Sequence, residues 1–172
     1  RGRVLPATLG DVNIWATTAS VKKVYGEENI DLGHYQDGRT LKEVYLDPPN
    51  VKAYKPAVDA IEMAHAIIVG PGDLFSTVIP TLIVPQIKKL ITTKDTIKIL
   101  IINIANKPFE TTGFTSKDYV KTIKDHIGND IFDKILINTN HSPKIPKELK
   151  YHYVANDMKE DDNKILEGDF VD

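Results

Sequence analysis

The sequence predicts an α/β protein in which an antiparallel β meander precedes a parallel sheet. Three apolar runs, 66–69, 97–104 and 134–138, have the length and the β-branched composition of buried strands. Segments with helical periodicity lie between them, and strands that alternate with helices form parallel sheets through right-handed crossovers. Residues 12–17 instead alternate apolar and polar side chains, which is typical of an antiparallel strand with one buried face.

Composition and charge narrow the class of protein. The chain has 172 residues, of which 41% are hydrophobic and 27% charged, as in a globular protein of one domain. Its formal net charge of −2 gives no reason to expect a nucleic-acid partner. The absence of cysteine excludes disulfides and zinc–thiolate sites. No apolar run spans a bilayer, and residues 1–6 lack the apolar centre of a signal peptide, so we expect no membrane span and a cytoplasmic location.

Residues 1–50 are expected to form the meander. Strands are predicted at 12–17, 21–25 and 41–46. Asp37-Gly38 marks a turn before the third strand, and Asp47-Pro48-Pro49-Asn50 closes it.

Residues 51–172 are expected to form the α/β portion of a single partial domain. A helix begins near Tyr54, with Pro56 in its first turn, where proline is tolerated. Residues 74–91 are helical in type, but Pro80 and Pro85 must break or kink this stretch.

The clearest helix precedes the third apolar run. Thr115 and Asp118 have the spacing of a capping box, and Gly128 can end the helix. A further strand is expected at 151–154, and residues 157–162 are mostly charged and are expected to be exposed.

The turn after the first apolar run is the principal candidate site. Gly70-Pro71-Gly72 joins the strand to a helix that starts at Leu74, with Asp73 in position to cap it. Backbone N–H groups converge at such a turn, and the helix dipole adds positive potential, so a phosphate can bind there. Ser76 and Thr77 are expected to donate hydrogen bonds to that phosphate. The alternative is an ordinary βα turn shaped by glycine for steric reasons.

Polar loops also follow the other two predicted parallel strands, at 103–113 and 138–141. Ligands lie beyond the carboxyl ends of such strands, so these loops should meet the glycine turn at one edge. Three asparagines there can hydrogen-bond a ribose, base or phosphate, or can simply cap loops: Asn103, Asn106 and Asn138.

Loop 106–113 contributes further candidates. Glu110 and Thr111 can orient a metal ion or a substrate, although an exposed loop acid is the alternative for Glu110. Lys107 can pair with phosphate or remain a solvated surface lysine.

At these loops the chain resembles the family of 2-phospho-L-lactate transferase (CofD), in particular its bacterial YvcK, or gluconeogenesis-factor, branch. That branch reads Gly-Pro-Gly-Ser-Leu-Tyr-Thr-Ser-Ile-x-Pro-Asn-Leu, and residues 70–82 read Gly-Pro-Gly-Asp-Leu-Phe-Ser-Thr-Val-Ile-Pro-Thr-Leu. It next reads Asn-x-x-Thr-Gln-Pro-Gly-Glu-Thr-x-Gly-Tyr-Thr, and residues 103–115 read Asn-Ile-Ala-Asn-Lys-Pro-Phe-Glu-Thr-Thr-Gly-Phe-Thr. The similarity runs over nearly the whole chain.

The resemblance implies a three-layer Rossmann-like fold, a phosphorylated ligand and a homodimer. In the gluconeogenesis-factor branch the implied role is regulation of carbon metabolism and cell-wall growth with UDP-sugar binding. In the transferase branch a phospholactyl group moves from a nucleotide diphosphate to a deazaflavin, with magnesium. The glycine-turn motif is nearer the first branch. The sequence leaves open whether the protein is an enzyme, and a partner-binding scaffold is the third interpretation.

Three departures from the family bear on the site. The family's N-terminal strand and Gly-Gly-Gly-Thr-Gly loop have no counterpart here, so the chain is interpreted as an internal portion of a longer protein with a half-built site. Asp73 replaces a serine and would repel a bare phosphate, unless it holds magnesium or only caps the helix. Lys107 replaces a glutamine.

Overall fold

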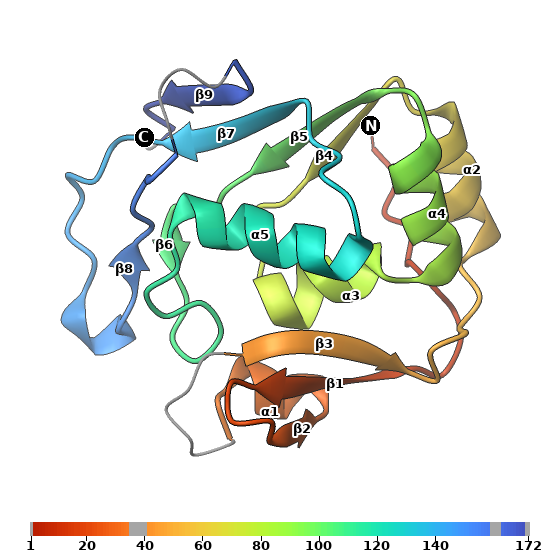
Figure 1. Ribbon diagram of the computed structural model, residues 1–172, viewed down its shortest axis with the longest axis horizontal. Helices are drawn as coiled ribbons and strands as arrows, with labels where there is room; N and C mark the ends of the chain where they lie inside the picture. The colour runs from red at the N-terminus through yellow and green to blue at the C-terminus, as the bar shows by residue number, and fades with distance from the viewer. Residues whose placement is uncertain (1, 35–40, 159–162, 171–172) are drawn as a thin grey trace.

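A four-stranded parallel sheet forms the centre of the computed structural model, which describes residues 2–34, 41–158 and 163–170. Its strands are β4 (Ala66–Val69), β5 (Ile97–Ile101), β7 (Lys134–Asn138) and β9 (Ile165–Gly168), in the order β4-β5-β7-β9 (Figure 1). The three predicted strands are confirmed as parallel neighbours. The sequence did not predict β9, which consists of only four residues and extends the sheet beside β7.

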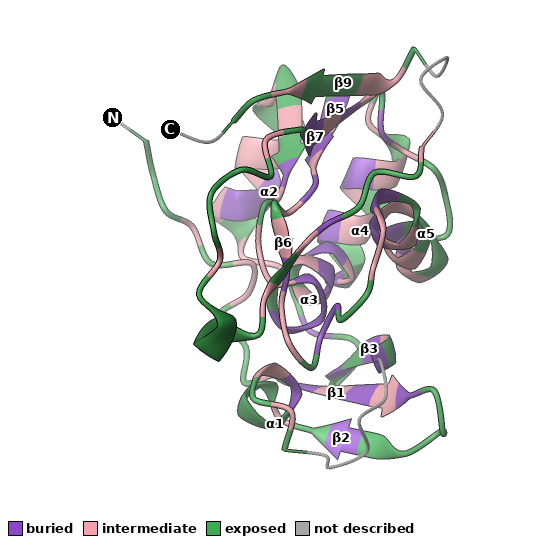
Figure 2. Ribbon diagram, turned by 90° about the vertical axis from the view of Figure 1, so that its left-hand side faces the viewer, coloured by how far each residue is buried: buried purple, intermediate pink, exposed green. Residues whose placement is uncertain are grey.

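The helices that cross between these strands pack on one face of the sheet. They are α4 (Pro85–Thr93), between β4 and β5, and α5 (Ser116–Ile127), between β5 and β7. Helix α2 (Lys55–Met63) precedes β4 and packs against α4, and Figure 2 shows α4 and α5 below the strands. The opposite face carries exposed isoleucines: Ile68 is 60% and Ile97 is 56% exposed. In β5, the buried residues Lys98 and Leu100 alternate with residues that are exposed or half-buried, whereas its composition predicted burial on both faces. The second helical layer of a three-layer fold is not formed by the described residues.

The apolar segment 74–91 is broken where its prolines predict. It consists of the π-helical turn η1 (Leu74–Val78), the short helix α3 (Ile79–Leu82), and α4, which begins at Pro85. Among the described residues no single helix is long and apolar enough to cross a bilayer; only Leu74–Leu82 and Pro85–Thr93 together, bent by 75°, reach that length and composition. Phe75 and Ile79 of this pair are fully buried in the core.

The N-terminal residues form the predicted antiparallel sheet, from β1 (Asn13–Thr18), β2 (Lys23–Tyr25) and β3 (Leu41–Asp47). Its order is β2-β1-β3, so the third strand pairs with the first. In a simple meander, the third strand would pair with the second. Helix α1 (Glu27–Asp31) lies between β2 and β3 in the sequence and packs against β1, β2 and the segment 74–78. The predicted Asp37-Gly38 turn lies outside the described residues.

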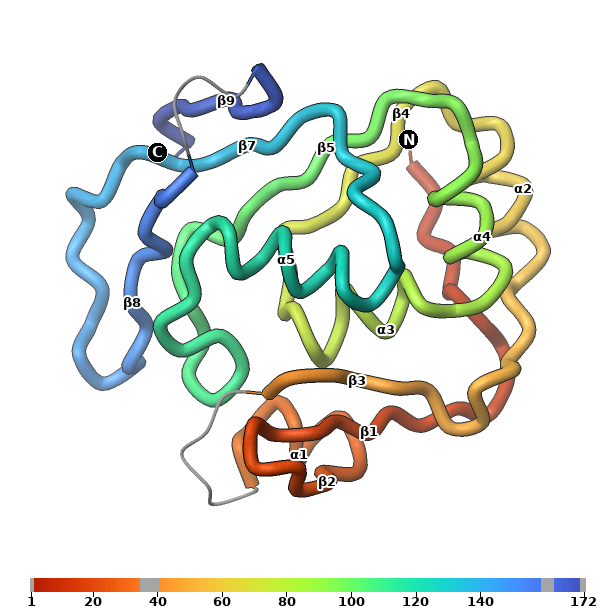
Figure 3. Tube along the Cα trace, in the orientation of Figure 1, coloured from red at the N-terminus to blue at the C-terminus, as the bar shows by residue number. Residues whose placement is uncertain are grey.

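The remaining elements frame the carboxyl edge of the parallel sheet. Strand β6 (Ala105–Asn106) pairs with β8 (His152–Tyr153) in a separate antiparallel ribbon, and η2 (Lys147–Leu149) precedes β8 (Figure 3). The strand predicted at 151–154 therefore exists but does not join the main sheet. Helix α5 has the predicted capping box of Thr115 and Asp118, and it ends at Gly128 with a φ of 91°.

Candidate functional site

The three predicted loops meet at one edge of the sheet, because β4, β5 and β7 run parallel and end there. The side chain of Asn103, just after β5, holds the glycine turn after β4. Its Oδ1 accepts a hydrogen bond from the Gly72 N–H at 3.1 Å, and its Nδ2 donates one to the Gly72 carbonyl at 2.9 Å. Asn103 thus fixes the turn to the neighbouring strand, and the Gly72 N–H is occupied within the protein.

The two glycines of the turn have different roles. Gly70 has a φ of +80°, and a Cβ there would lie 2.7 Å from the Ile101 carbonyl oxygen, so both conformation and space require glycine. A Cβ on Gly72 would meet only the Cγ2 atom of Val78, at 3.2 Å, and its φ lies outside the left-handed region. The close approach of backbone is therefore at Gly70.

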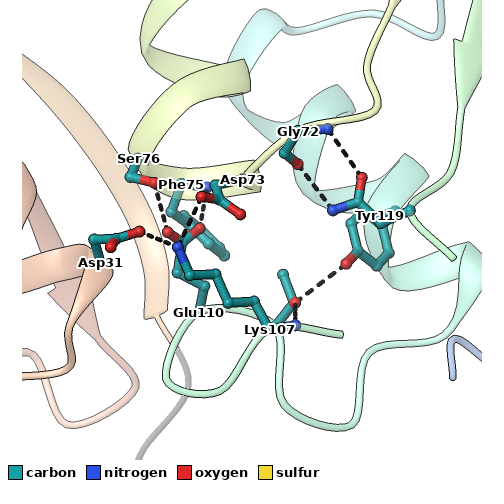
Figure 4. Close-up of polar contacts among 10 residues, drawn as sticks. Asp31, Gly72, Asp73, Phe75, Ser76, Lys107, Glu110 and Tyr119 are labelled. Atoms are coloured by element: carbon teal, nitrogen blue, oxygen red, sulfur yellow. Dashed lines mark hydrogen bonds and ion pairs between the residues drawn. The ribbon is translucent and has the colours of Figure 1, made fainter. Parts of the chain in front are cut away.

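Glu110 is fully buried and caps the helix that follows the turn. Its carboxylate accepts hydrogen bonds from the Phe75 N–H at 2.9 Å and from Ser76 Oγ at 2.6 Å (Figure 4). Burial raises the pKa of Glu110, while these two hydrogen bonds act in the opposite direction. Ser76, expected to donate to a phosphate, donates to this carboxylate instead, and the alternative of Glu110 as an exposed loop acid is wrong.

Asp73 occupies the N-cap position, but its side chain makes no capping hydrogen bond. Its Oδ2 lies 2.7 Å from Lys107 Nζ, and Lys107 also pairs with Asp31 (Figure 4). The expectation that Asp73 caps the helix is wrong, since Glu110 takes that function. The expectation of a solvated Lys107 is also wrong, because its side chain is only 17% exposed.

A buried hydrogen-bond network lies beneath loop 106–113. The Tyr119 hydroxyl donates to Asn106 Oδ1 at 3.2 Å or to Thr111 Oγ1 at 3.1 Å, and the Lys107 N–H donates to Thr111 Oγ1 at 3.0 Å. Burial raises the pKa of Tyr119 to about 12, so the hydroxyl stays protonated. Asn106 and Thr111 are buried, and these contacts set the conformation of the loop.

Asn138, at the end of β7, likewise bonds within the protein. Its Nδ2 donates to the Asn140 carbonyl at 2.7 Å, and its Oδ1 accepts from the Phe170 N–H at 3.0 Å. It lies at the predicted edge and joins the loop after β7 to the segment after β9.

Beside the glycine turn lies a groove of about 490 Å³. The polar side chains of its lining are those of Arg3, Thr77 and Thr81, and the turn itself lines it through Gly70, Pro71 and Gly72. Ala57, Ile61 and Ile67 are among the apolar lining residues. Arg3 and Thr77 are both exposed.

Sequence reasoning missed three residues of this region. Arg3 reaches the groove from the N-terminal segment, Asp31 reaches Lys107 from α1, and Tyr119 reaches loop 106–113 from α5. No local motif marks any of them. For Tyr119 a usable signal existed, because it lies four residues before Ile123 on the buried face of α5.

Loops gathered at the carboxyl edge of a parallel α/β sheet define a Rossmann-like protein. The family model of 2-phospho-L-lactate transferase CofD matches residues 1–171, and the chain belongs to that family.

Gluconeogenesis factors are among its relatives. The chain is 36% identical over 151 residues to the gluconeogenesis factor of Listeria monocytogenes, which covers 88% of this chain and 45% of that protein. It is 35% identical over 153 residues to that of Bacillus subtilis, covering 89% and 46%. The crystal structure of a UPF0052-family protein from Bacillus halodurans superposes with a TM-score of 0.82 at 29% identity, over 98% of this chain and 56% of that one. The chain thus spans less than half the length of these curated relatives.

Proposed function

We propose that this chain contributes the binding site for a phosphorylated ligand, a nucleotide diphosphate or a UDP-sugar, in a protein of the gluconeogenesis-factor type. Its role would be to regulate carbon metabolism and cell-wall growth in response to that ligand. Membership of the CofD family and the names of the relatives support the assignment to the gluconeogenesis-factor type.

The groove beside the Gly70 turn carries the proposal. Its volume of about 490 Å³ suits a nucleotide-sized ligand, and its apolar wall suits a base or sugar ring. Arg3 offers a guanidinium and Thr77 a hydroxyl to a phosphate in this groove. The N–H groups of Gly72 and Phe75 already donate hydrogen bonds to Asn103 and Glu110. The proposed phosphate contacts are therefore the side chains of Arg3 and Thr77.

Calorimetric titration with UDP-N-acetylglucosamine and with GDP tests the proposal. Arg3→Ala and Thr77→Ala should each weaken binding, by about tenfold or more for Arg3, because a charge-assisted hydrogen bond contributes about 1.5–3 kcal/mol. Thr93→Ala, an exposed helical threonine outside the groove, is the matched control. Unchanged affinity in both groove variants would contradict the proposed site.

We also propose that further residues of a longer protein complete this site. The exposed Ile68 and Ile97 support this, since parallel sheets are normally covered on both faces. A longer protein that contains this chain should then bind the ligand more tightly than residues 1–172 alone. Equal affinity would count against a half-built site.

We also propose that the protein is a homodimer. Light scattering on the same samples tests this.

Turnover distinguishes the transferase alternative. Incubation with a nucleotide-diphosphate-linked phospholactate, a deazaflavin acceptor and magnesium should give no product if the protein only binds its ligand. Product formation would favour the transferase alternative.

A thermal-shift measurement tests the third alternative, a partner-binding scaffold. If neither the nucleotide nor the UDP-sugar raises the melting temperature, the scaffold becomes the better interpretation.

A further inference from the structure

Lys107 lies within a cluster of three carboxylates. One oxygen from each of Asp31, Asp73 and Glu110 lies within 4.8 Å of the others, an arrangement that could hold a metal ion. The Lys107 ammonium pairs with Asp31 and lies 2.7 Å from Asp73 Oδ2. Figure 4 shows its side chain extended between these two acids. The three acids come from α1, the glycine turn and loop 106–113, so the cluster is a product of the tertiary fold.

The ammonium is a permanent feature of this cluster. Burial lowers the pKa of Lys107, but the hydrogen bonds and charges of Asp31 and Asp73 outweigh that effect and raise it above the usual range. The side chain therefore carries a positive charge at neutral pH.

A magnesium ion does not fit beside this lysine. Magnesium requires near-octahedral oxygen ligands at about 2.0–2.1 Å, so an ion bound to both Asp31 and Asp73 would lie next to Lys107 Nζ. The two cations would repel each other in a partly buried site. The oxygens of the third acid, Glu110, already accept hydrogen bonds from Phe75 and Ser76.

We propose that Lys107 is the resident cation of the cluster formed by Asp31, Asp73 and Glu110, and that it takes the place of a divalent metal. Asp73 is then a partner of Lys107 and not a magnesium ligand in this chain. A neutral side chain at position 107 would leave two partly buried aspartates and a buried glutamate without a compensating charge. Position 107 therefore decides whether the cluster takes a metal.

Titration with MgCl₂ or MnCl₂ in the absence of nucleotide tests this, so the result does not depend on the proposed ligand. Heat of binding and melting temperature are measured together. We expect no specific binding to the wild-type cluster. Lys107→Gln should melt at a lower temperature without metal, and should gain a metal site at least about tenfold tighter than any in the wild type. Adding Asp73→Asn to Lys107→Gln should abolish that gain.

Two variants serve as controls. Lys107→Arg keeps the positive charge and should gain no metal site. Lys121→Gln removes an exposed lysine paired with a single acid, Asp125, and makes the same change in net charge, so it should not respond to metal either.

Two outcomes would overturn the proposal. The first is that the wild-type protein binds Mg²⁺ and that Asp73→Asn abolishes this binding. This comparison can be made even if Lys107→Gln fails to fold. The other is a folded Lys107→Gln protein that gains no metal binding.

Discussion

The carboxylate of Glu110 accepts a hydrogen bond from the backbone N–H of Phe75, at 2.9 Å and across thirty-five positions of sequence. The first turn of a helix leaves N–H groups without intrahelical partners, and a neighbouring side chain usually satisfies them. Here the local candidate, Asp73, pairs with Lys107, and the cap comes from a distant loop. The glycine turn, the helix after it and loop 106–113 are therefore one connected unit.

Replacing Glu110 should destabilise this unit strongly. Glu110→Ala leaves the Phe75 N–H and Ser76 Oγ buried without an acceptor, which we expect to cost about 3 kcal/mol of unfolding free energy. Glu110→Gln keeps one carbonyl acceptor but presents an amide donor to the second partner, and should cost about half as much. Urea unfolding measures both. Ser76→Ala removes the hydroxyl that donates to Glu110 and leaves no buried donor without an acceptor, so it should cost less than either Glu110 variant. A Glu110→Ala protein as stable as the wild type would show that the cap is unimportant.

The two glycines of the turn should respond differently to alanine. Gly70→Ala forces a Cβ into a left-handed conformation and to within 2.7 Å of the Ile101 carbonyl, and we expect a cost of about 2 kcal/mol or more. Gly72→Ala meets only a side-chain methyl of Val78 and should change stability by less than about 1 kcal/mol. Thermal unfolding of the pair provides the comparison, in which equal stabilities would contradict the assigned roles.

Gly72→Val tests the groove rather than the fold. Position 72 lines the groove, so a larger side chain there should weaken nucleotide binding while the melting temperature stays near that of Gly72→Ala. Calorimetry on the two variants separates obstruction from backbone strain. Wild-type affinity in Gly72→Val would show that the ligand does not approach this part of the turn.

Asn103 should contribute to stability through its two bonds to Gly72. Asn103→Ala removes both, and the exposed side of the turn allows water to compensate in part, so we expect a loss of about 1–2 kcal/mol. Asn103→Asp keeps the acceptor for the Gly72 N–H but places a carboxylate oxygen against the Gly72 carbonyl, and should fall at least as far. Hydrogen exchange at the Gly72 amide gives a local readout: faster exchange is expected in Asn103→Ala.

His126 should make stability depend on pH. Its Nε2 accepts a hydrogen bond from the Val44 N–H at 2.9 Å, and its Nδ1 bonds to the Thr122 carbonyl at 2.7 Å, so it is neutral with the proton on Nδ1. Burial lowers the pKa of His126 from the ordinary value of 6.5. The folded state binds this proton less readily than the unfolded state. Its contribution to stability is therefore present above pH 6.5 and is lost as the pH falls below 6.5 through the lowered pKa of the folded state.

Unfolding free energies of the wild type and of His126→Gln, measured from about pH 7.5 to 5.5, check this prediction. Glutamine does not titrate, and its carbonyl can accept from Val44. The wild type should lose more stability on acidification than the variant. Parallel pH profiles would show that His126 is not the group responsible.

Much of the candidate site could be placed from sequence, because position along a parallel strand decides which edge a loop occupies. Residues 70–73, Asn103 and Asn138 lie where the order of strands and helices predicted. Their partners could not be predicted in the same way. The pairing of Lys107 with Asp31 depends on how α1 packs near the glycine turn, and no periodicity or motif encodes that distance.

The sequence by itself determined the class of fold, the broken helix at Pro80 and Pro85, and the capping box at Thr115, since each depends on local sterics or on apolar periodicity. Only the tertiary structure decided that Glu110 caps the helix after the glycine turn and that Asp73 does not. A buried carboxylate needs hydrogen-bond donors or a positive charge nearby, because it has lost its contact with water. Here packing supplies these partners from residues far apart in the chain, so local sequence does not reveal them.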